Sequence, residues 1–270
     1  MARSRLVTGF SIAAVLIIAI FIKPLSWILY LLLAVSAFIG TYEYTRIAEK
    51  REARPTRPVA YLFIAALLYD AWRFNLAHFL SIVIAAVAVT LVLRIFIRGY
   101  IGSVAGSAAT IFSGLWMGLS MALGIMILKL DNGRFLIGLL MAVVFLGDSG
   151  AWYTGKKWGR TKLAPRLSPN KSIEGALGGL ATSVITAIIC QLILLAIGRA
   201  MFSFGGVLTF GVLFGAAGQV GDLLESGFKR DAGIKDSGTI IAGHGGILDL
   251  MDSLIFCIPL MYLYLIYMPF

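Results

Sequence analysis

The chain has 270 residues and a net charge of +10; 60% of its residues are hydrophobic, only 13% are charged, and the mean hydropathy is +0.93. An average soluble domain is about 45–50% apolar and about 25% charged, so this composition excludes a water-soluble globule, a disordered chain, a collagen and a coiled coil. The presence of only two cysteines excludes a disulfide scaffold. We therefore interpret the sequence as an all-α, polytopic integral membrane helix bundle.

A helix needs about 20 mostly apolar residues to cross the hydrocarbon core of a bilayer. The chain contains continuous apolar blocks and lacks the alternating pattern that is typical of β-barrel strands. The first block is expected to be an uncleaved helix and not a signal peptide, because no clear cleavage site follows it. Nine membrane spans are predicted, over residues 7–22, 25–42, 59–72, 76–97, 108–128, 134–151, 176–198, 203–224 and 247–267.

The basic residues are distributed unevenly between the loops that join these spans. If nine spans alternate from a cytoplasmic N-terminus, 18 of the 23 Lys and Arg residues lie inside and five lie outside. Cytoplasmic loops carry an excess of Lys and Arg, so this distribution predicts that the N-terminus is cytoplasmic. The basic face is expected to attract anionic lipids and phosphate groups. Nucleic acid is not expected as a partner, because the basic residues lie in short loops.

Three pairs of glycines, each four residues apart, allow two helices to approach closely in lipid. We interpret them as sites of packing within the chain, with a contact between subunits as the alternative. The pairs are Gly114 with Gly118, Gly175 with Gly179, and Gly211 with Gly215.

Eight of the 13 acidic residues follow residue 147, and several of them stand at the ends of predicted spans. A carboxylate at membrane depth is costly unless it is paired or bound to a metal. Asp222 and Glu225 end the eighth span, whereas Asp249 and Asp252 begin the ninth; each pair, three residues apart, shares one helix face. Together with Asp148 at the end of the sixth span, these oxygen ligands predict a metal site, since Mg²⁺ prefers oxygen. The alternative is ion pairing with neighbouring lysines and arginines.

The loop between the last two spans combines cations with glycines. Lys and Arg side chains bind phosphate, and glycines let backbone N–H groups approach a ligand closely. The N-terminus of the ninth span adds its dipole, so the loop is predicted to bind phosphate groups. The residues that carry this prediction are Lys229, Arg230, Lys235, Gly243, His244, Gly245 and Gly246.

The run from Ser226 to Asp252 resembles the C-terminal motif of phosphatidate cytidylyltransferases, also called CDP-diacylglycerol synthases. The motif is carried by Ser226, Lys229, Arg230, Lys235, Asp236, Gly243, His244, Gly245, Gly246, Asp249 and Asp252. The resemblance extends upstream to Gly221, Asp222 and Glu225, and to Asp148, Ser168, Pro169, Lys171, Ser172, Glu174 and Gly175. Two positions depart from the family pattern, since Ala242 replaces a proline and Leu250 replaces an arginine.

The resemblance implies an enzyme of phospholipid biosynthesis that transfers CMP from CTP to phosphatidate. It also implies Mg²⁺, a second cation such as K⁺, and a location in the bacterial plasma membrane with the active site facing the cytoplasm. A homodimer is compatible with it. The residues implied to be catalytic are Asp222, Asp249, Asp252, Lys229 and Arg230. Those implied to bind substrate are Lys171, Ser172, Glu174, Lys235, Asp236, Gly243, His244, Gly245 and Gly246. Those implied to bind metal are Asp222, Asp249, Asp252 and Asp148.

Two parts of the chain are expected to have different roles. Residues 1–130 would supply packing and access for lipid, and residues 131–270 would hold the catalytic helices with cytoplasmic loops 152–175 and 225–246. An ion-coupled transporter that uses the clustered carboxylates is the alternative function, but it leaves the cations and glycines of the last loop unexplained. A CDP-alcohol phosphotransferase is disfavoured because its motif needs an Asp-Gly dipeptide, which the sequence lacks.

Overall fold

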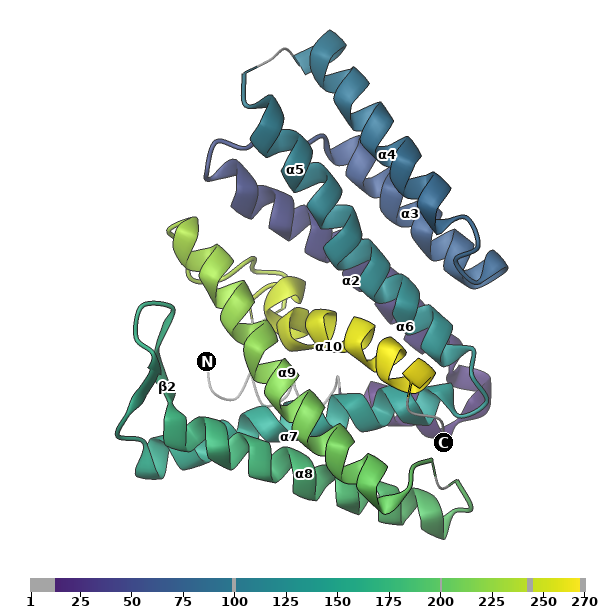
Figure 1. Ribbon diagram of the computed structural model, residues 1–270, viewed down its shortest axis with the longest axis vertical. Coiled ribbons are helices and arrows are strands. Elements are labelled where there is room, and N and C mark those ends of the chain that lie inside the picture. Colours follow the sequence, from purple (N-terminus) through teal and green to yellow (C-terminus); the bar gives the residue numbers. More distant parts are fainter. Residues whose placement is uncertain (1–12, 99–100, 200, 242–244, 268–270) are drawn as a thin grey trace. The chain divides into compact units, whose positions relative to one another are not determined.

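A computed structural model describes residues 13–98, 101–199, 201–241 and 245–267. The described chain is almost entirely helical, apart from one small hairpin and one isolated β-bridge, which confirms the all-α prediction (Figure 1). Seven helices among these residues are long and apolar enough to cross a membrane. They are Lys23–Glu49, Phe79–Phe96, Ser103–Leu128, Gly133–Trp158, Ile173–Ala196, Phe204–Asp231 and Ile247–Tyr267.

Two of the nine predicted spans are not among these seven. The first predicted span lies partly outside the described residues, of which 13–21 are helical. The third forms helix α3 (Arg57–Phe74), which carries three charged residues, Arg57, Asp70 and Arg73, within its 18 residues. The cytoplasmic position of the N-terminus stays a prediction.

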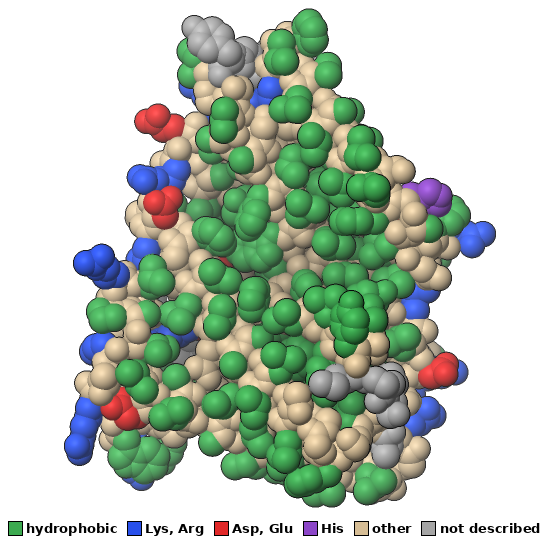
Figure 2. All heavy atoms as spheres, viewed as in Figure 1, with side chains coloured by type: hydrophobic (Ala, Val, Ile, Leu, Met, Phe, Trp, Pro, Cys, Tyr) green, Lys and Arg blue, Asp and Glu red, His purple; other side chains and the backbone are tan. Residues whose placement is uncertain are grey.

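The protein is an integral membrane protein. Large apolar side chains lie exposed on its helices, and Figure 2 shows hydrophobic side chains spread over the face that it draws, with the charged groups near its edges. Phe96 and Val104, for example, are 81% and 84% exposed. Such exposure would be unfavourable in water but is stable against lipid chains.

One compact unit contains Met1–Lys129 and Phe228–Met251. Within it, α2 packs against α3, α5 and α6, and α3 also packs against α4. Its short helical turns and helices are η1 (Lys23–Leu25), α2 (Trp27–Glu49), α3, α4 (Phe79–Leu93), η2 (Arg94–Arg98), α5 (Ser103–Ser113), η3 (Gly114–Leu119) and α6 (Ser120–Leu128). The core includes Ile64 and Leu67 of α3, which are fully buried with Met117 and Met121.

The second unit contains Leu130–Gly227 and Asp252–Phe270. Its elements are α7 (Gly133–Trp158), β1 (Lys162–Ala164), β2 (Ser168–Ser172), α8 (Ile173–Ala196), most of α9 (Phe204–Asp231) and most of α10 (Ile247–Tyr267). Helices α7 and α8 pack along each other, and β1 pairs with β2 in an antiparallel hairpin. Phe210 and Phe214 of α9 pack with Tyr264 of α10, whose hydroxyl donates to the Gly206 carbonyl at 2.9 Å.

Two helices extend beyond the spans predicted for them. The sixth span was expected to end at residue 151 and the eighth at 224, whereas α7 continues to Trp158 and α9 to Asp231. A continuous apolar block marks only the part of a helix that lies in lipid. Lysine, arginine and glutamate are good helix formers, so a helix continues into water where the apolar pattern ends.

The three glycine pairs lie against other helices of the same chain. A Cβ at Gly114 or Gly118 would meet Phe63 or Ile64 of α3. A Cβ at Gly175 or Gly179 would meet Ala151 of α7, and one at Gly211 or Gly215 would meet Val184 or Ser183 of α8. These contacts confirm the interpretation that the pairs serve packing within the chain.

Candidate active site

Three helices of the second unit each contribute one aspartate to an acidic group, defined here as Asp148 of α7, Asp222 of α9 and Asp252 of α10. The three carboxylates lie close enough to act on one another electrostatically. Lys171 of β2 is the cation that reaches this group, with its Nζ 2.5 Å from Oδ2 of Asp222. Among the described residues, the ion pair of this group is that of Lys171 with Asp222, and the carboxylates of Asp148 and Asp252 add further negative charge beside it.

Gly221 allows α9 and α10 to approach at the acidic group. A Cβ at this position would lie 2.9 Å from the carbonyl oxygen of Asp252 and 2.9 Å from the Cα of Ser253. Both neighbours are backbone atoms, which cannot rotate away as a side chain would. Only glycine at position 221 therefore permits this close contact of α9 with α10 beside Asp222 and Asp252.

Replacing Gly221 by alanine is expected to push α9 away from α10 and to lower activity by about tenfold to a hundredfold, since a small displacement of catalytic groups is costly. The overpacking should also destabilise the protein by about 1–3 kcal/mol. Gly227→Ala is the matched control, because it gains the same helix propensity on the same helix while its nearest neighbour, Leu167 Cδ2, is 3.8 Å away. Thermal unfolding and turnover of both variants test this; equal behaviour would contradict the close-contact role of Gly221.

The acidic group suits a divalent cation of the Mg²⁺ type. Within the described residues, no three His, Cys, Asp or Glu side chains converge tightly enough to enclose a metal ion by themselves. Mg²⁺ usually keeps several waters and is held by one or two carboxylates together with substrate phosphates. An excess of carboxylate charge that does not form a closed cage fits that mode of binding.

The hairpin that carries Lys171 is fixed to α8 by two side chains. Glu174 accepts the backbone N–H groups of Arg160 and Thr161, each at 3.1 Å. Ser172 caps α8, because its Oγ accepts the N–H of Gly175 at 3.1 Å. The structure thus gives Glu174 and Ser172 contacts that hold the hairpin in place beside the acidic group.

Asp249 lies in the first unit and has four polar contacts. Its Oδ1 is 2.6 Å from Nζ of Lys229, and both side chains are largely buried, with 9% and 12% exposure. Its Oδ2 accepts the N–H and the hydroxyl of Ser237 and the N–H of Gly246, each at 2.8 Å. The structure therefore brings together the predicted residues Lys229, Asp249 and Gly246. In this structure Asp249 forms an ion pair with Lys229 and accepts hydrogen bonds from the loop that precedes α10.

Glu43 of α2 is a functional candidate that the sequence analysis missed. It is 1% exposed, and it accepts the N–H groups of Ile247 and Leu248 at 3.2 and 2.7 Å. Its Oε2 also lies 3.1 Å from the hydroxyl of Ser237. Glu43 thus satisfies the first N–H groups of α10 from another helix, which is the position where a negative charge is most favourable. The signal in the sequence was a carboxylate directly after the end of the predicted span 25–42.

The remaining predicted residues occupy the segment between α9 and α10. Arg230 donates to the carbonyl of Ile234 at 3.1 Å, and so closes the end of α9. Gly245 has a φ of +96°, a conformation that favours glycine, and a Cβ there would press against the Asp249 carboxylate. Lys235 and Asp236 are exposed and line a cavity. Gly243 and His244 lie outside the described residues.

Comparison with known proteins gives a family match along nearly the whole chain. The sequence model described as "Cytidylyltransferase family" matches residues 3–268. A phosphatidate cytidylyltransferase of Staphylococcus saprophyticus is 43% identical over 136 residues, which are 50% of this chain and 51% of that protein. Proteins of the same name from Staphylococcus haemolyticus and Staphylococcus aureus are 46% and 48% identical over 138 and 136 residues. The aligned part spans about half the length of these curated relatives.

Proposed function

Because the chain belongs to the cytidylyltransferase family, we propose that it is a membrane-bound phosphatidate cytidylyltransferase of bacterial phospholipid biosynthesis. It transfers CMP from CTP to phosphatidate and produces CDP-diacylglycerol and pyrophosphate. The observation that carries this proposal is the acidic group beside Lys171, together with the names of the aligned relatives. The active site faces the cytoplasm of the plasma membrane, where CTP is available.

The reaction needs charge neutralisation more than it needs a base. An oxygen of the phosphatidate phosphate forms a bond to the α-phosphorus of CTP, and the bond from that phosphorus to the bridging oxygen of the β-phosphate breaks. Pyrophosphate leaves with the electron pair, and any proton on the lipid phosphate passes to solvent or to pyrophosphate. The nucleophile is already an anion, so positioning and electrostatic stabilisation account for most of the catalysis.

The acidic group would hold Mg²⁺ through Asp222 and Asp252, with Asp148 as a further oxygen ligand. When bound, the metal neutralises phosphate charge and orients the triphosphate. A second cation such as K⁺ would offset the remaining negative charge. Lys171, now paired with Asp222, is placed to turn to a substrate phosphate, and Glu174 and Ser172 keep its hairpin in position.

The first unit would supply a second set of groups. Lys229 and Lys235 provide charge for phosphate groups, and Arg230 holds the end of α9 next to them. Asp249 would bind metal only after releasing Lys229, which would then be free to bind substrate. Gly243 and His244 would offer backbone N–H groups to these phosphates. Gly245 and Gly246, whose N–H groups donate to Ile241 and Asp249, would shape the turn around the phosphates, with Asp236 beside them. We also propose a homodimer, whose contacts would lie away from the glycine pairs used inside the chain.

Removing divalent metal is expected to reduce CDP-diacylglycerol formation at least about a hundredfold, because metal stabilises the transferring phosphoryl group. Purified protein in detergent–lipid micelles with phosphatidate and CTP would be treated with EDTA and then supplied with excess Mg²⁺. Lipid product measured by mass spectrometry should disappear and return. Product formation that continues unchanged in EDTA would contradict the metal role of the acidic group.

A transporter is not supported by the family match or by the names of the relatives. The same purified protein would test this alternative in liposomes, where a transporter would move ions without consuming CTP.

A further inference from the structure

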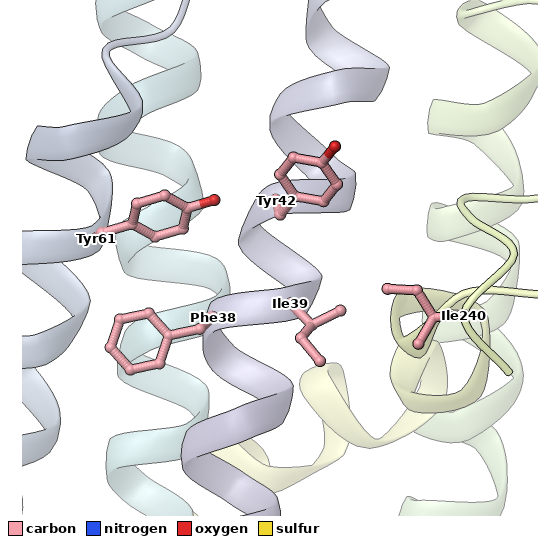
Figure 3. A pocket seen from close by; sticks show the side chains of 5 residues that line it. All are labelled: Phe38, Ile39, Tyr42, Tyr61 and Ile240. Carbon is pink, nitrogen blue, oxygen red and sulfur yellow. The ribbon is translucent and has the colours of Figure 1, made fainter.

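Helix α2 and the segment after α9 form two cavities of opposite character within the first unit. The cationic cavity has a volume of about 400 Å³, and Arg46, Lys50 and Lys235 line it with Asp236 and the backbone that follows. The apolar cavity has a volume of about 490 Å³. It is lined by Phe38, Ile39, Tyr42, Tyr61 and Ile240 (Figure 3).

No ion pair neutralises the three cations of the first cavity within the described part of the chain. Among the described residues, no carboxylate lies within ion-pair distance of Arg46, Lys50 or Lys235. The adjacent Arg51, in contrast, pairs with Asp231 at 3.1 Å. Three cations against the one carboxylate of Asp236 leave the cavity positively charged. An anion with several oxygen acceptors, such as a phosphate monoester, matches this charge.

The second cavity is lined by aromatic and aliphatic side chains. Figure 3 shows Phe38 and Ile39 on one turn of α2 and Tyr42 on the next, with Tyr61 approaching from α3 and Ile240 from the loop. Phe38 and Tyr61 lie with ring centroids 6.1 Å apart. The wall is therefore almost wholly apolar, and it belongs to a helix that spans the membrane.

The two cavities lie next to each other, both along α2 and along the loop that follows α9. Tyr42 and Arg46 stand about one turn apart on α2, and the Arg46 guanidinium carbon is 5.7 Å from the Tyr42 ring centroid. On the loop, Thr239 of the cationic cavity is followed directly by Ile240 of the apolar one. Charge thus lies at the end of α2, and the apolar wall lies one to three turns further into the span.

We propose that these two cavities form one binding site for an anionic phospholipid, with its phosphate on Arg46, Lys50 and Lys235 and an acyl chain against Phe38, Ile39 and Tyr61. The proposal rests on the proposed function, because it places phosphatidate there as the substrate. A nucleotide carries phosphates but has no chain for the apolar wall, so the lipid matches both cavities and CTP matches only one. Residues 38–50 of the first unit thereby select the lipid substrate.

Charge removal tests the phosphate end of this site. Arg46→Gln and Lys50→Gln are each expected to raise the KM for phosphatidate in mixed micelles about fivefold to tenfold, as expected for one lost cation near a lipid phosphate. The KM for CTP should stay within about twofold. Arg51→Gln is the matched control, since it removes the same charge from the next residue, which lines neither cavity and forms only an exposed ion pair.

A larger side chain in the apolar cavity tests whether the acyl chain of the lipid binds there. Ile39→Trp is expected to raise the KM for long-chain phosphatidate about tenfold while leaving that for a short-chain analogue nearly unchanged, because the added ring occupies the space of the chain. Val35→Trp is the control, since Val35 lies one turn away on α2, is 39% exposed and lines neither cavity.

Native mass spectrometry measures lipid retention without any turnover, so it separates this inference from the proposed function. The wild type and the Arg51→Gln and Val35→Trp controls should retain phosphatidate over phosphatidylcholine, whereas the site variants should lose it, even if no CDP-diacylglycerol is formed. Site variants that retain phosphatidate like the controls would overturn the inference. A raised KM for CTP with an unchanged KM for phosphatidate would also overturn it, and would assign the cationic cavity to the nucleotide.

Discussion

Asp252→Asn is expected to lower the turnover number about a thousandfold or more, while the protein stays folded. The substitution removes one half-buried negative charge from the acidic group and hardly changes the volume of the side chain. A loss of about 4 kcal/mol of charge stabilisation in the transition state corresponds to this factor. The structure also predicts the sign of the stability change. Asp252 lies near the carboxylates of Asp148 and Asp222, and Lys171 pairs with Asp222, so removing the charge of Asp252 relieves repulsion and should keep or raise Tm.

Turnover with saturating CTP and phosphatidate, together with thermal unfolding in the same detergent, would measure both effects. Asp231→Asn is the matched control, because Asp231 pairs with Arg51 at the surface with both side chains 61% exposed. Such pairs contribute little, so the control should keep full activity and stability. Near-normal turnover of the Asp252→Asn protein would show that the acidic group does not take part in catalysis.

Glu43→Ala should have the second large effect, which combines loss of stability with loss of activity. The substitution leaves the N–H groups of Ile247 and Leu248 without their acceptor in a buried place. Each orphaned donor costs about 1–3 kcal/mol. We therefore expect a loss of roughly 3 kcal/mol or more in unfolding free energy and a fall in Tm of roughly 6–12 °C. Activity should fall too, because the start of α10 carries Asp249.

Two further variants separate the role of Glu43 from a general effect of removing charge. Glu49→Ala removes a carboxylate from the same helix, where it pairs with Arg57 at 2.7 Å and is 44% exposed, and should change Tm by little. Glu43→Gln keeps one acceptor oxygen and should lie between the wild type and the alanine variant. If Glu43→Ala unfolded at the same temperature as Glu49→Ala, the capping role would be wrong.

The fold was largely predictable because apolar composition determines membrane helices. Continuous apolar blocks located the helices, and glycine pairs predicted close packing that the structure confirms at Phe63 and Val184. Helix ends were less accurate, since α7 and α9 continue seven residues beyond their apolar blocks. Hydropathy shows which part of a helix lies in lipid, but it does not show at which residue the helix ends.

The candidate site was predictable in its residue types more than in its contacts. Spacing correctly placed Asp249 and Asp252 one turn apart on α10, but it gives helix faces and not distances. The pairing of Asp249 with Lys229 depends on the fold of the loop, and the contact of Lys171 with Asp222 depends on the hairpin. Glu43 lies about 200 residues before its partners, and one sequence contains no signal for such a distant contact.

The fate of each phosphate of CTP distinguishes CMP transfer from other reactions of the nucleotide. Purified protein in detergent–phospholipid micelles would receive phosphatidate, Mg²⁺ and CTP labelled at either the α- or the γ-phosphorus. Transfer of CMP predicts that the α label enters the lipid extract, that the γ label is recovered as pyrophosphate, and that the two appear in equal amounts. Label from the γ-phosphorus in the lipid, or no labelled lipid from folded protein at saturating CTP, would contradict the proposed activity.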